Sequence, residues 1–342
     1  MIQTPPTGPL VFASADYDGL ELRCVGQACL ILVGQSRLAQ VLNAGDDPHL
    51  VMGANMLGLS YEAAVAQHER EKEERAKRYV ELIARGLPKE QASVQTGKDV
   101  PAPADDARQA GKVANFGFWG GLGAEKLVLF ARKTYKVLLS VDGENGLPSA
   151  KALKRTWFAT YPEARKYLDL VSKLQGPAGA TFRHLFTNRI QGGASYTETA
   201  NSFFQGLGAA ATGHALFLIA EACYTPSPCR GCNGSIAGCA WCKTVGEPGV
   251  SAMYGTRPVN YVHDDNIDET PEYKGHEVAH ELVRIMIEGA APYLPDVPAT
   301  AKPQLSRFWS KDAKQVWVPD PTSLVLDKQG NGKRLVPWPK AA

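Results

Sequence analysis

Three side chains in the segment RQAGKVANFGFWGG recur at a spacing of four residues: Arg108, Lys112 and Phe116. Residues four apart return to the same face of an α-helix, so these three would form one ridge. Arginine and lysine neutralise phosphate oxygens, and an aromatic ring can pack against a sugar and a base. The spacing therefore indicates a helix that could bind a nucleoside triphosphate along one face.

Two aspartates, Asp16 and Asp264, each lie at the end of an apolar, strand-like run. Carboxylates held close together can bind two divalent metal ions, one activating an attacking hydroxyl and the other stabilising a leaving pyrophosphate. Magnesium suits this role because it needs few protein carboxylates and completes its coordination shell with phosphate and water. If the two runs are adjacent strands, we expect two catalytic Mg²⁺ ions there.

Four of the seven cysteines follow the pattern Cys229-x2-Cys232-x6-Cys239-x2-Cys242. Paired CxxC sequences are typical of a structural zinc site with four thiolate ligands, although the six-residue spacer is short. The alternative is a group of reduced thiols without a metal. We expect one structural Zn²⁺ in this segment, which looks like an insertion.

A second metal-binding pattern, HExxH, occurs at His276, Glu277 and His280. On a helix the two imidazoles would share a face and Glu277 could act as a general base, as in zinc peptidases. No third ligand follows at a familiar spacing, so a metallopeptidase is the weaker alternative.

The bulk composition restricts the possible partners. The chain has 342 residues, 44% of them hydrophobic, and a net charge of +2, which argues against coating of nucleic acid by a basic protein. No apolar run approaches the roughly 20 residues of a membrane helix, and no signal-peptide pattern opens the chain. We therefore expect a cytoplasmic protein without a membrane partner.

The elements that must position these residues follow from periodicity. Residues 11–33 indicate a strand and then an apolar helix, with Asp16 at the strand's end. Opposite charges four residues apart in 68–86 indicate a solvated helix, and Asp105 or Asp106 could cap the helix that carries the ridge. The later elements are expected to be helical (151–176), a hairpin or loop (182–197), helical (201–223), strand–turn–strand (257–271) and an amphipathic helix (275–294).

Taken together, four separated segments resemble the motifs of the family A DNA polymerases, the bacterial polymerase I kind. The segments occur in the family's order over about 250 residues, which makes a chance match improbable. They are residues 16–23 (motif A), Arg108, Lys112, Asn115, Phe116 and Gly117 (motif B, the fingers helix), Asn201 with Gln205 and Gly206 (the helix before motif C), and residues 262–265 (motif C).

For the metal and sugar sites, the resemblance implies specific roles. Asp16 and Asp264 would ligate both metal ions, assisted by the carbonyl of Tyr17 and by Asp265 as an auxiliary acid. Glu21 would lie beneath the sugar of the nucleotide and exclude a 2′-hydroxyl.

For the triphosphate and the DNA, the resemblance implies further contacts. Arg108 and Lys112 would hold the triphosphate, and Phe116 would pack on the sugar and base. The residues implied to contact the primer end, the minor groove or the template backbone are His263, Asn201, Gln205 and Arg189.

Three departures from the family pattern matter. Asp265 stands where the family has Glu, and Gly120, beside Trp119, stands where it has the Tyr that gates the template base. The chain also begins only 15 residues before Asp16, so we expect a separate chain to supply the thumb and any exonuclease, as in a split phage polymerase.

The resemblance implies an α/β (α+β) fold in which a palm with an antiparallel sheet is joined to a helical fingers subdomain, with thumb and exonuclease absent. The expected boundaries are 1–60 (palm), 61–190 (fingers) and 191–342 (palm), with a Cys-rich insertion at 223–245. The expected function is template-directed DNA synthesis from dNTPs on primer-template DNA, in the bacterial host cytoplasm if the chain is phage-encoded. A non-catalytic, nucleic-acid-binding polymerase remnant is the alternative.

Overall fold

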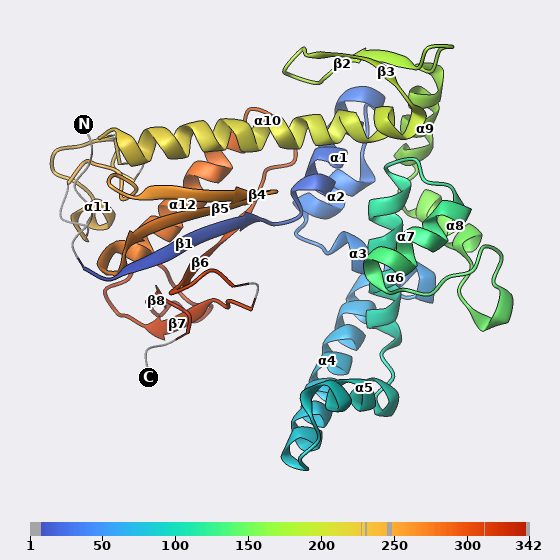
Figure 1. The fold of residues 1–342 in the computed structure, drawn as a ribbon, viewed down its shortest axis with the longest axis horizontal. Helices are drawn as coiled ribbons and strands as arrows, with labels where there is room; N and C mark the ends of the chain where they lie inside the picture. Colours follow the sequence, from blue (N-terminus) through green and yellow to red (C-terminus); the bar gives the residue numbers. More distant parts are fainter. Residues whose placement is uncertain (1–7, 227, 230, 245–247, 311, 340–342) are drawn as a thin grey trace. The chain divides into compact units, whose positions relative to one another are not determined.

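A computed structural model describes residues 8–226, 228–229, 231–244, 248–310 and 312–339 (Figure 1). The chain divides into two compact units: unit 1 comprises Met1–Glu21 and Leu207–Ala342, and unit 2 comprises Leu22–Gly206. The boundaries between these units fall at 21/22 and 206/207, whereas the boundaries expected from sequence are 60/61 and 190/191. The Cys-rich insertion expected at 223–245 includes residues 227, 230 and 245, which lie outside the described residues.

Unit 1 is built on an antiparallel four-stranded sheet in the order β4-β5-β1-β6. Its strands are β1 (Leu10–Tyr17), β4 (Arg257–Val262), β5 (Asp265–Pro271) and β6 (Ala301–Ser306). The register pairs Asp16 with Asp265 on one side and with Lys302 on the other. The predicted strand–turn–strand at 257–271 is confirmed, with a turn of only two residues between β4 and β5.

Helix α12 (Gly275–Ala290) packs against β1 and β6 (Figure 1). Gly275 permits this close packing because it has no side chain. A Cβ there would lie only 3.2 Å from side-chain carbons of Leu305 and Val11. The hydroxyl of Tyr17, the last residue of β1, donates a 2.6 Å hydrogen bond to the carbonyl of Met286 in α12. This contact and the packing fix the end of β1, where Asp16 lies.

Helix α10 (Tyr196–Tyr224) corrects one expectation from sequence, because it reaches the length and mean hydropathy of a membrane span, 1.4 over 18 residues. Its fully buried side chains recur every three or four residues, which is the pattern of a helix packed against a protein core. This stripe consists of Ala200, Phe204, Leu207, Ala211, Ala215, Ile219 and Ala222, and Thr199 and Cys223 are fully buried beside its two ends. We therefore interpret α10 as a core helix. Unit 1 also contains α11 (Ala240–Thr244), the short 3₁₀ helix Glu272–Lys274, β7 (Val316–Pro319) and β8 (Lys333–Val336).

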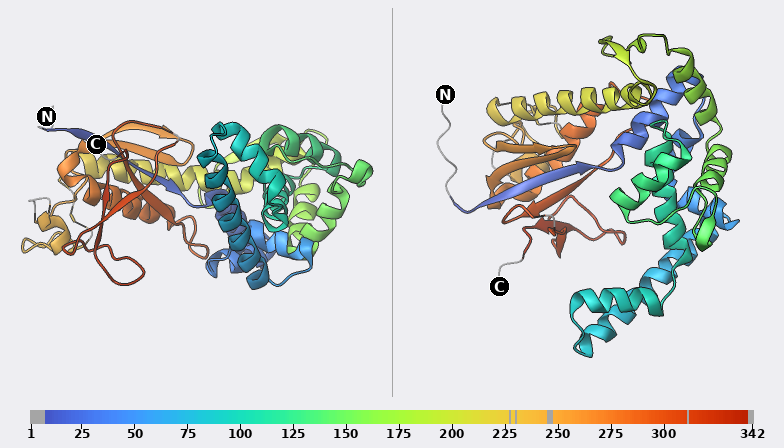
Figure 2. Two further views of the ribbon diagram at one scale, coloured as in Figure 1. Left: turned by 90° about the horizontal axis from the view of Figure 1, so that it is seen from below. Right: turned by 45° about the vertical axis from the view of Figure 1, so that its right-hand side comes forward.

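Unit 2 is mainly helical, with one β-hairpin. Its elements are α1 (Leu20–Val33, which begins in unit 1), α2 (Arg37–Asn43), α3 (Pro48–Leu57), α4 (Tyr61–Ala84), α5 (Lys89–Asp99), α6 (Pro103–Phe118), α7 (Ala124–Phe130), a π-helical turn (Ala131–Tyr135), a 3₁₀ turn (Glu144–Gly146), α8 (Ala150–Thr160), α9 (Glu163–Lys173), β2 (Ala180–Arg183) and β3 (Ile190–Ala194). The α4–α5 pair extends away from α7 and α8 within this unit (Figure 2). Several helices begin at a residue whose side chain accepts a hydrogen bond from the first turn, as at Ser36, Asp47, Ser60 and Ser149.

The start of α6 differs from the expectation, because the helix begins at Pro103 and neither Asp105 nor Asp106 caps it. The cap comes from α4 instead: the Glu71 carboxylate accepts hydrogen bonds from the backbone N–H groups of Ala104 and Asp105, each at 3.0 Å. Glu71 is buried, so the interpretation of 68–86 as a merely solvated helix was wrong for this residue. A carboxylate at a helix N-terminus also interacts favourably with the helix dipole.

Helices α3 and α6 pack unusually closely. A Cβ at Gly111 would lie 2.3 Å from the carbonyl oxygen of His49, and a Cβ at Gly53 would lie 3.0 Å from the α6 backbone. Glycine is therefore required at Gly111 to hold α6 against the N-terminus of α3. With the helical unit 2 and the sheet of unit 1, the structure confirms the predicted α/β class with an antiparallel sheet and many helices.

Candidate active site

Three carboxylates meet at one end of the unit 1 sheet. Asp16 lies one residue before the end of β1, and its register partner Asp265 begins β5. Asp264 lies in the two-residue turn between β4 and β5, together with His263, whose φ of 61° is left-handed. The structure thus brings Asp16, Asp264 and Asp265 together, as the resemblance implied.

The charge of Asp264 affects the protonation of its neighbours Asp16 and Asp265. Partial burial raises the pKa of Asp16 to about 6, and the charge of Asp264 and a hydrogen bond between the two side chains add to the rise. Burial likewise raises the pKa of Asp265 to about 6, with contributions from the charges of Asp16 and Asp264. Like charges raise carboxyl pKa values in this way when no cation compensates them.

Positive charge near this cluster is limited. Lys302 of β6 pairs with Asp18, their Nζ and Oδ2 atoms being 3.0 Å apart. Within the described ranges, no lysine or arginine forms an ion pair with any of the three clustered carboxylates. The charge of Lys302 opposes the rise in the Asp16 pKa only in part, so the cluster keeps an excess of negative charge that suits it to receive cations.

Glu21, in the first turn of α1, lies near the same cluster. Burial raises the pKa of Glu21, and the charge of Asp264 contributes. His263 is exposed at the tip of the β4–β5 turn. The hydroxyl of Tyr17 contacts α12. The ligand role expected for its carbonyl stays a prediction.

In unit 2, α6 presents Arg108, Lys112 and Phe116 as partly exposed side chains on a helix that is otherwise largely buried. Arg108 Nε donates a 2.6 Å hydrogen bond to Asp47 Oδ2. Lys112 Nζ lies 5.6 Å from the centroid of the Tyr135 ring. The predicted ridge is therefore confirmed as one face of α6.

Phe116 lies among other rings. Its ring centroid is 5.4 Å from that of His49 and 6.4 Å from that of Tyr135. The Phe116 and Tyr135 rings are stacked, with an angle of 11° between their planes. Burial and the charges of Arg108 and Lys112 lower the pKa of His49 to about 4, against the opposing effect of Asp47. The imidazole is therefore neutral at physiological pH.

Sequence reasoning missed Asp47, His49 and Tyr135 as neighbours of the ridge. Asp47 carries a signal, because Asp followed by Pro marks the start of a helix, and its side chain indeed accepts from the N–H groups of His49 and Leu50. Burial alone would raise the pKa of Asp47, but its hydrogen bond and ion pair with Arg108 lower it. Nothing in the local pattern identifies Tyr135.

The residues predicted to contact DNA come from three segments of the chain: α10, the β2–β3 hairpin and the β4–β5 turn. Asn201 and Gln205 lie one helical turn apart in α10, and Gln205 and Arg189 are exposed. Asn201 Nδ2 donates to the carbonyl of Thr197 at 2.7 Å. A Cβ at Gly120 would lie 2.8 Å from Asn201 Oδ1, so Asn201 occupies the space beside Gly120.

The HExxH motif has contacts that are incompatible with a peptidase site. Both ring nitrogens of His276 are engaged: Nδ1 accepts from the backbone N–H of Leu335 at 3.0 Å, and Nε2 lies 3.3 Å from Ser323 Oγ. Glu277 is buried in an ion pair with Arg334 at 3.0 Å. Because these groups of His276 and Glu277 are already engaged by protein partners, the peptidase alternative loses its support.

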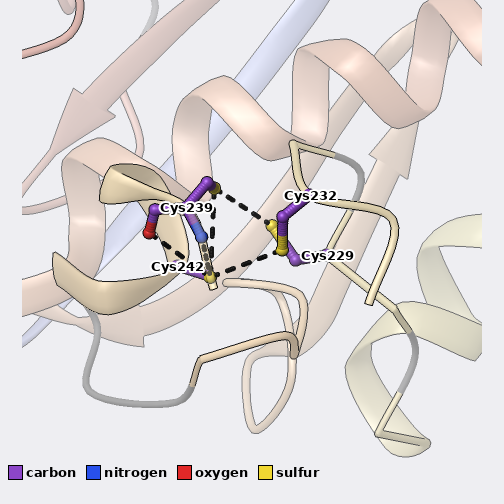
Figure 3. Close-up of side chains that lie close together, drawn as sticks. All are labelled: Cys229, Cys232, Cys239 and Cys242. Atoms are coloured by element: carbon purple, nitrogen blue, oxygen red, sulfur yellow. Dashed lines mark hydrogen bonds between the residues drawn. The ribbon is translucent and has the colours of Figure 1, made fainter. Parts of the chain in front are cut away.

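The four cysteines of the CxxC pairs lie together, with their sulfur atoms within 4.8 Å of one another (Figure 3). This cluster belongs to unit 1 and lies apart in sequence from the carboxylates.

Comparison with known proteins finds one similar sequence and one similar structure. No family model matches the chain. DNA polymerase I of Aquifex aeolicus (strain VF5) is 24% identical over 221 residues, which are 65% of this chain and 33% of that protein. The chain thus spans about a third of the length of this curated relative.

Among solved structures, the POL domain of Pol1 from M. smegmatis, in complex with DNA primer-template and dNTP, matches with a TM-score of 0.54 and 17% identity. The match covers 90% of this chain and 41% of that one. The chain therefore has the fold of a polymerase I-like polymerase domain.

Proposed function

We propose that this chain is a template-directed DNA polymerase that adds dNTPs to the 3′ end of a primer. The observation that carries the proposal is the group Asp16, Asp264 and Asp265 at the end of the β1–β5 pair, three carboxylates without a paired cation. The fold supports it, since the similar POL domain of Pol1 was solved with DNA primer-template and dNTP.

The donor set fits Mg²⁺. Carboxylate oxygens are the ligands that this hard cation prefers, and a partly solvated cluster leaves room for water and phosphate oxygens. Asp16 and Asp264, with the Tyr17 carbonyl, would hold two ions, and Asp265 would assist. Bound there, Mg²⁺ would lower the pKa of the primer hydroxyl and neutralise charge on the pyrophosphate.

The chain's own residues would position the nucleotide. Arg108 and Lys112 would bind triphosphate oxygens, and Phe116 would pack on the sugar and base. The Asp47 carboxylate orients Arg108 Nε and leaves the terminal nitrogens of the guanidinium available for phosphate. Glu21, near Asp264, would lie beneath the sugar and reject a 2′-hydroxyl.

Contacts with DNA are proposed for His263, Asn201, Gln205 and Arg189, supported by the exposure of His263, Gln205 and Arg189. A separate chain that supplies a thumb and an exonuclease, an origin in a phage and action in the host cytoplasm remain predictions from the resemblance. Co-purification with a tagged copy of this chain tests the first of them.

Primer extension tests the proposal. The purified chain with Mg²⁺, a primer-template and a single dNTP should add the nucleotide that the template base specifies. Asp16→Asn and Asp264→Asn should abolish the addition. Asp18→Asn is the matched control, because Asp18 lies two residues from Asp16 but outside the acidic cluster, where it pairs with Lys302. Folded protein that never extends a primer would instead indicate a nucleic-acid-binding remnant.

A further inference from the structure

The sulfur atoms of the Cys-rich insertion are arranged as a compact group (Figure 3). The Sγ atoms of Cys229 and Cys239 are 3.8 Å apart, those of Cys232 and Cys242 are 3.7 Å apart, and those of Cys239 and Cys242 are 3.9 Å apart. All four thiols are free, and these separations exceed the roughly 2.05 Å of a disulfide bond.

We propose that these four cysteines bind one Zn²⁺ ion as a structural site, and that the ion holds α11 so that Trp241 docks on α12. The proposal is independent of the proposed polymerase activity. Four ligands around a zinc ion at a Zn–S distance of about 2.3 Å place the sulfur atoms roughly 3.8 Å apart if the site is tetrahedral. The observed separations match this value, and four thiolates select zinc rather than magnesium.

The backbone around the cluster is arranged for sulfur. The N–H groups of Cys239 and Gly249 each lie 3.2 Å from Cys242 Sγ and donate to it. Such donors to a ligand atom orient it and stabilise its negative charge. A Cβ at Gly231 would lie 3.0 Å from Cys239 Sγ, and a Cβ at Gly238 would lie 3.0 Å from Cys242 Sγ and 2.8 Å from Pro248 Cβ. Gly238 also has a left-handed φ of 65°, so that position needs glycine.

The insertion has almost no hydrophobic core of its own. Among its described residues between 225 and 250, the buried hydrophobic side chains are those of Cys229 and Cys242, and Ile236 is 94% exposed. A segment with so little apolar burial cannot offset the loss of chain entropy on ordering. Metal binding supplies folding free energy directly in such modules.

Helix α11 connects the cluster to the rest of unit 1 through Trp241. Its ring centroid lies 5.8 Å from that of His276 and 5.7 Å from that of His280, edge-on to the latter at 89°. Trp317 of β7 packs on His280 as well, at 5.9 Å. The histidines of the HExxH motif therefore act as aromatic packing partners, and Cys242 follows Trp241 directly, so the metal would fix its position.

Metal content tests the proposal. The full chain, purified with a reductant and dialysed against metal-free buffer, should retain about one zinc per chain by inductively coupled plasma mass spectrometry. The Cys232→Ser/Cys239→Ser double variant should fall to background. Cys29→Ala is the matched control, because Cys29 is a buried cysteine of α1 outside the cluster, and it should keep its zinc.

Two further readouts keep the test decisive if the double variant folds poorly. Cobalt added to the metal-free wild-type chain should give the visible absorption of a tetrahedral tetrathiolate complex. Loss of the metal should speed trypsin cleavage after Lys243, which is exposed beside Cys242. A folded wild-type chain without zinc, without the cobalt signature and with seven reactive thiols would overturn the proposal, as would zinc that the double variant retains.

Discussion

Unit 1 contains an acidic cluster and a cysteine cluster, for each of which we propose a metal site, and the two differ in chemistry and in solvent access. The acidic cluster, Asp16, Asp264 and Asp265, offers hard oxygen donors that solvent reaches. The cysteine cluster offers four soft sulfur donors around one point and receives backbone N–H groups. Structural metal sites are closed by protein ligands, whereas catalytic sites keep positions open for substrate.

This contrast indicates how one unit could hold both proposed metals, one catalytic and one structural, without confusion between them. The β1–β5 register and a two-residue turn present the carboxylates at one end of the two central strands of the sheet. The cysteines lie in an insertion with little core of its own. The first cluster is held by the fold, while the second would hold its own segment together.

Chelation should separate the two sites with the largest effect. Brief treatment with EDTA should abolish primer extension completely, and added Mg²⁺ should restore it, because open carboxylate sites exchange their ions readily. Zinc should remain bound during the same treatment, because a closed tetrathiolate site releases it slowly. Zinc content and extension measured on one sample check this, and loss of both together would break the comparison.

Exchange of a hard ligand for a soft one should lower the polymerase activity almost as much as EDTA does. Asp264→Cys should lower the Mg²⁺-supported rate of single-nucleotide addition by about 10³-fold or more, since thiolate is a poor ligand for magnesium. Mn²⁺ or Cd²⁺ should restore part of the rate. Asp18→Cys is the control and should need no such rescue, and an Asp264→Cys chain with full Mg²⁺ activity would contradict the assignment.

The cationic ridge should have a smaller effect, mainly on nucleotide binding. Lys112→Ala and Arg108→Ala should each raise the KM for dNTP by roughly 10- to 100-fold, because each removes a charge-assisted contact with triphosphate. Lys72→Ala is a suitable control, since Lys72 is exposed in α4 and pairs with Glu69. Steady-state kinetics measures the effect, and an unchanged KM in both ridge variants would exclude this role.

The smallest effect concerns Asp268, a carboxylate of β5 behind the acidic cluster. Burial raises the pKa of Asp268 to about 7. An unfolded aspartate titrates near ~3.9, so between about pH 4 and pH 7 the folded chain binds more protons and its stability falls as the pH rises. Asp268→Asn should remove this loss and raise the free energy of unfolding at pH 8 by roughly 1 kcal/mol or more.

Denaturant unfolding at pH 5 and pH 8 measures that gain, which should be smaller at pH 5. A variant that is less stable than wild type at pH 8 would show that the Asp268 carboxylate has a compensating partner.

Several features could be predicted from the sequence because they depend on local patterns. The spacing of Arg108, Lys112 and Phe116 sets one helix face by geometry alone. The runs ending at Asp16 and Asp264 became strands, and the short turn after Val262 was visible in the polar residues that follow it. The CxxC spacing likewise brought its four sulfur atoms together.

Other features depend on contacts between distant segments, which no local pattern specifies. Glu71 caps α6 across more than 30 residues, so the expected caps at Asp105 and Asp106 were wrong. The pairing of Tyr135 with Phe116 is likewise a tertiary contact. HExxH matched a catalytic pattern, but the packing of Trp241 and Trp317 on its histidines could be seen only in the structure.

Manganese binding followed by electron paramagnetic resonance tests the central claim most directly, because Mn²⁺ replaces Mg²⁺ at carboxylate sites and free and bound ions are distinguishable. We expect the wild-type chain and Cys232→Ser/Cys239→Ser to bind Mn²⁺ alike, and Asp16→Asn and Asp264→Asn to lose this binding. Mn²⁺ binding that survives both aspartate variants would contradict the account of the acidic cluster as the open metal site.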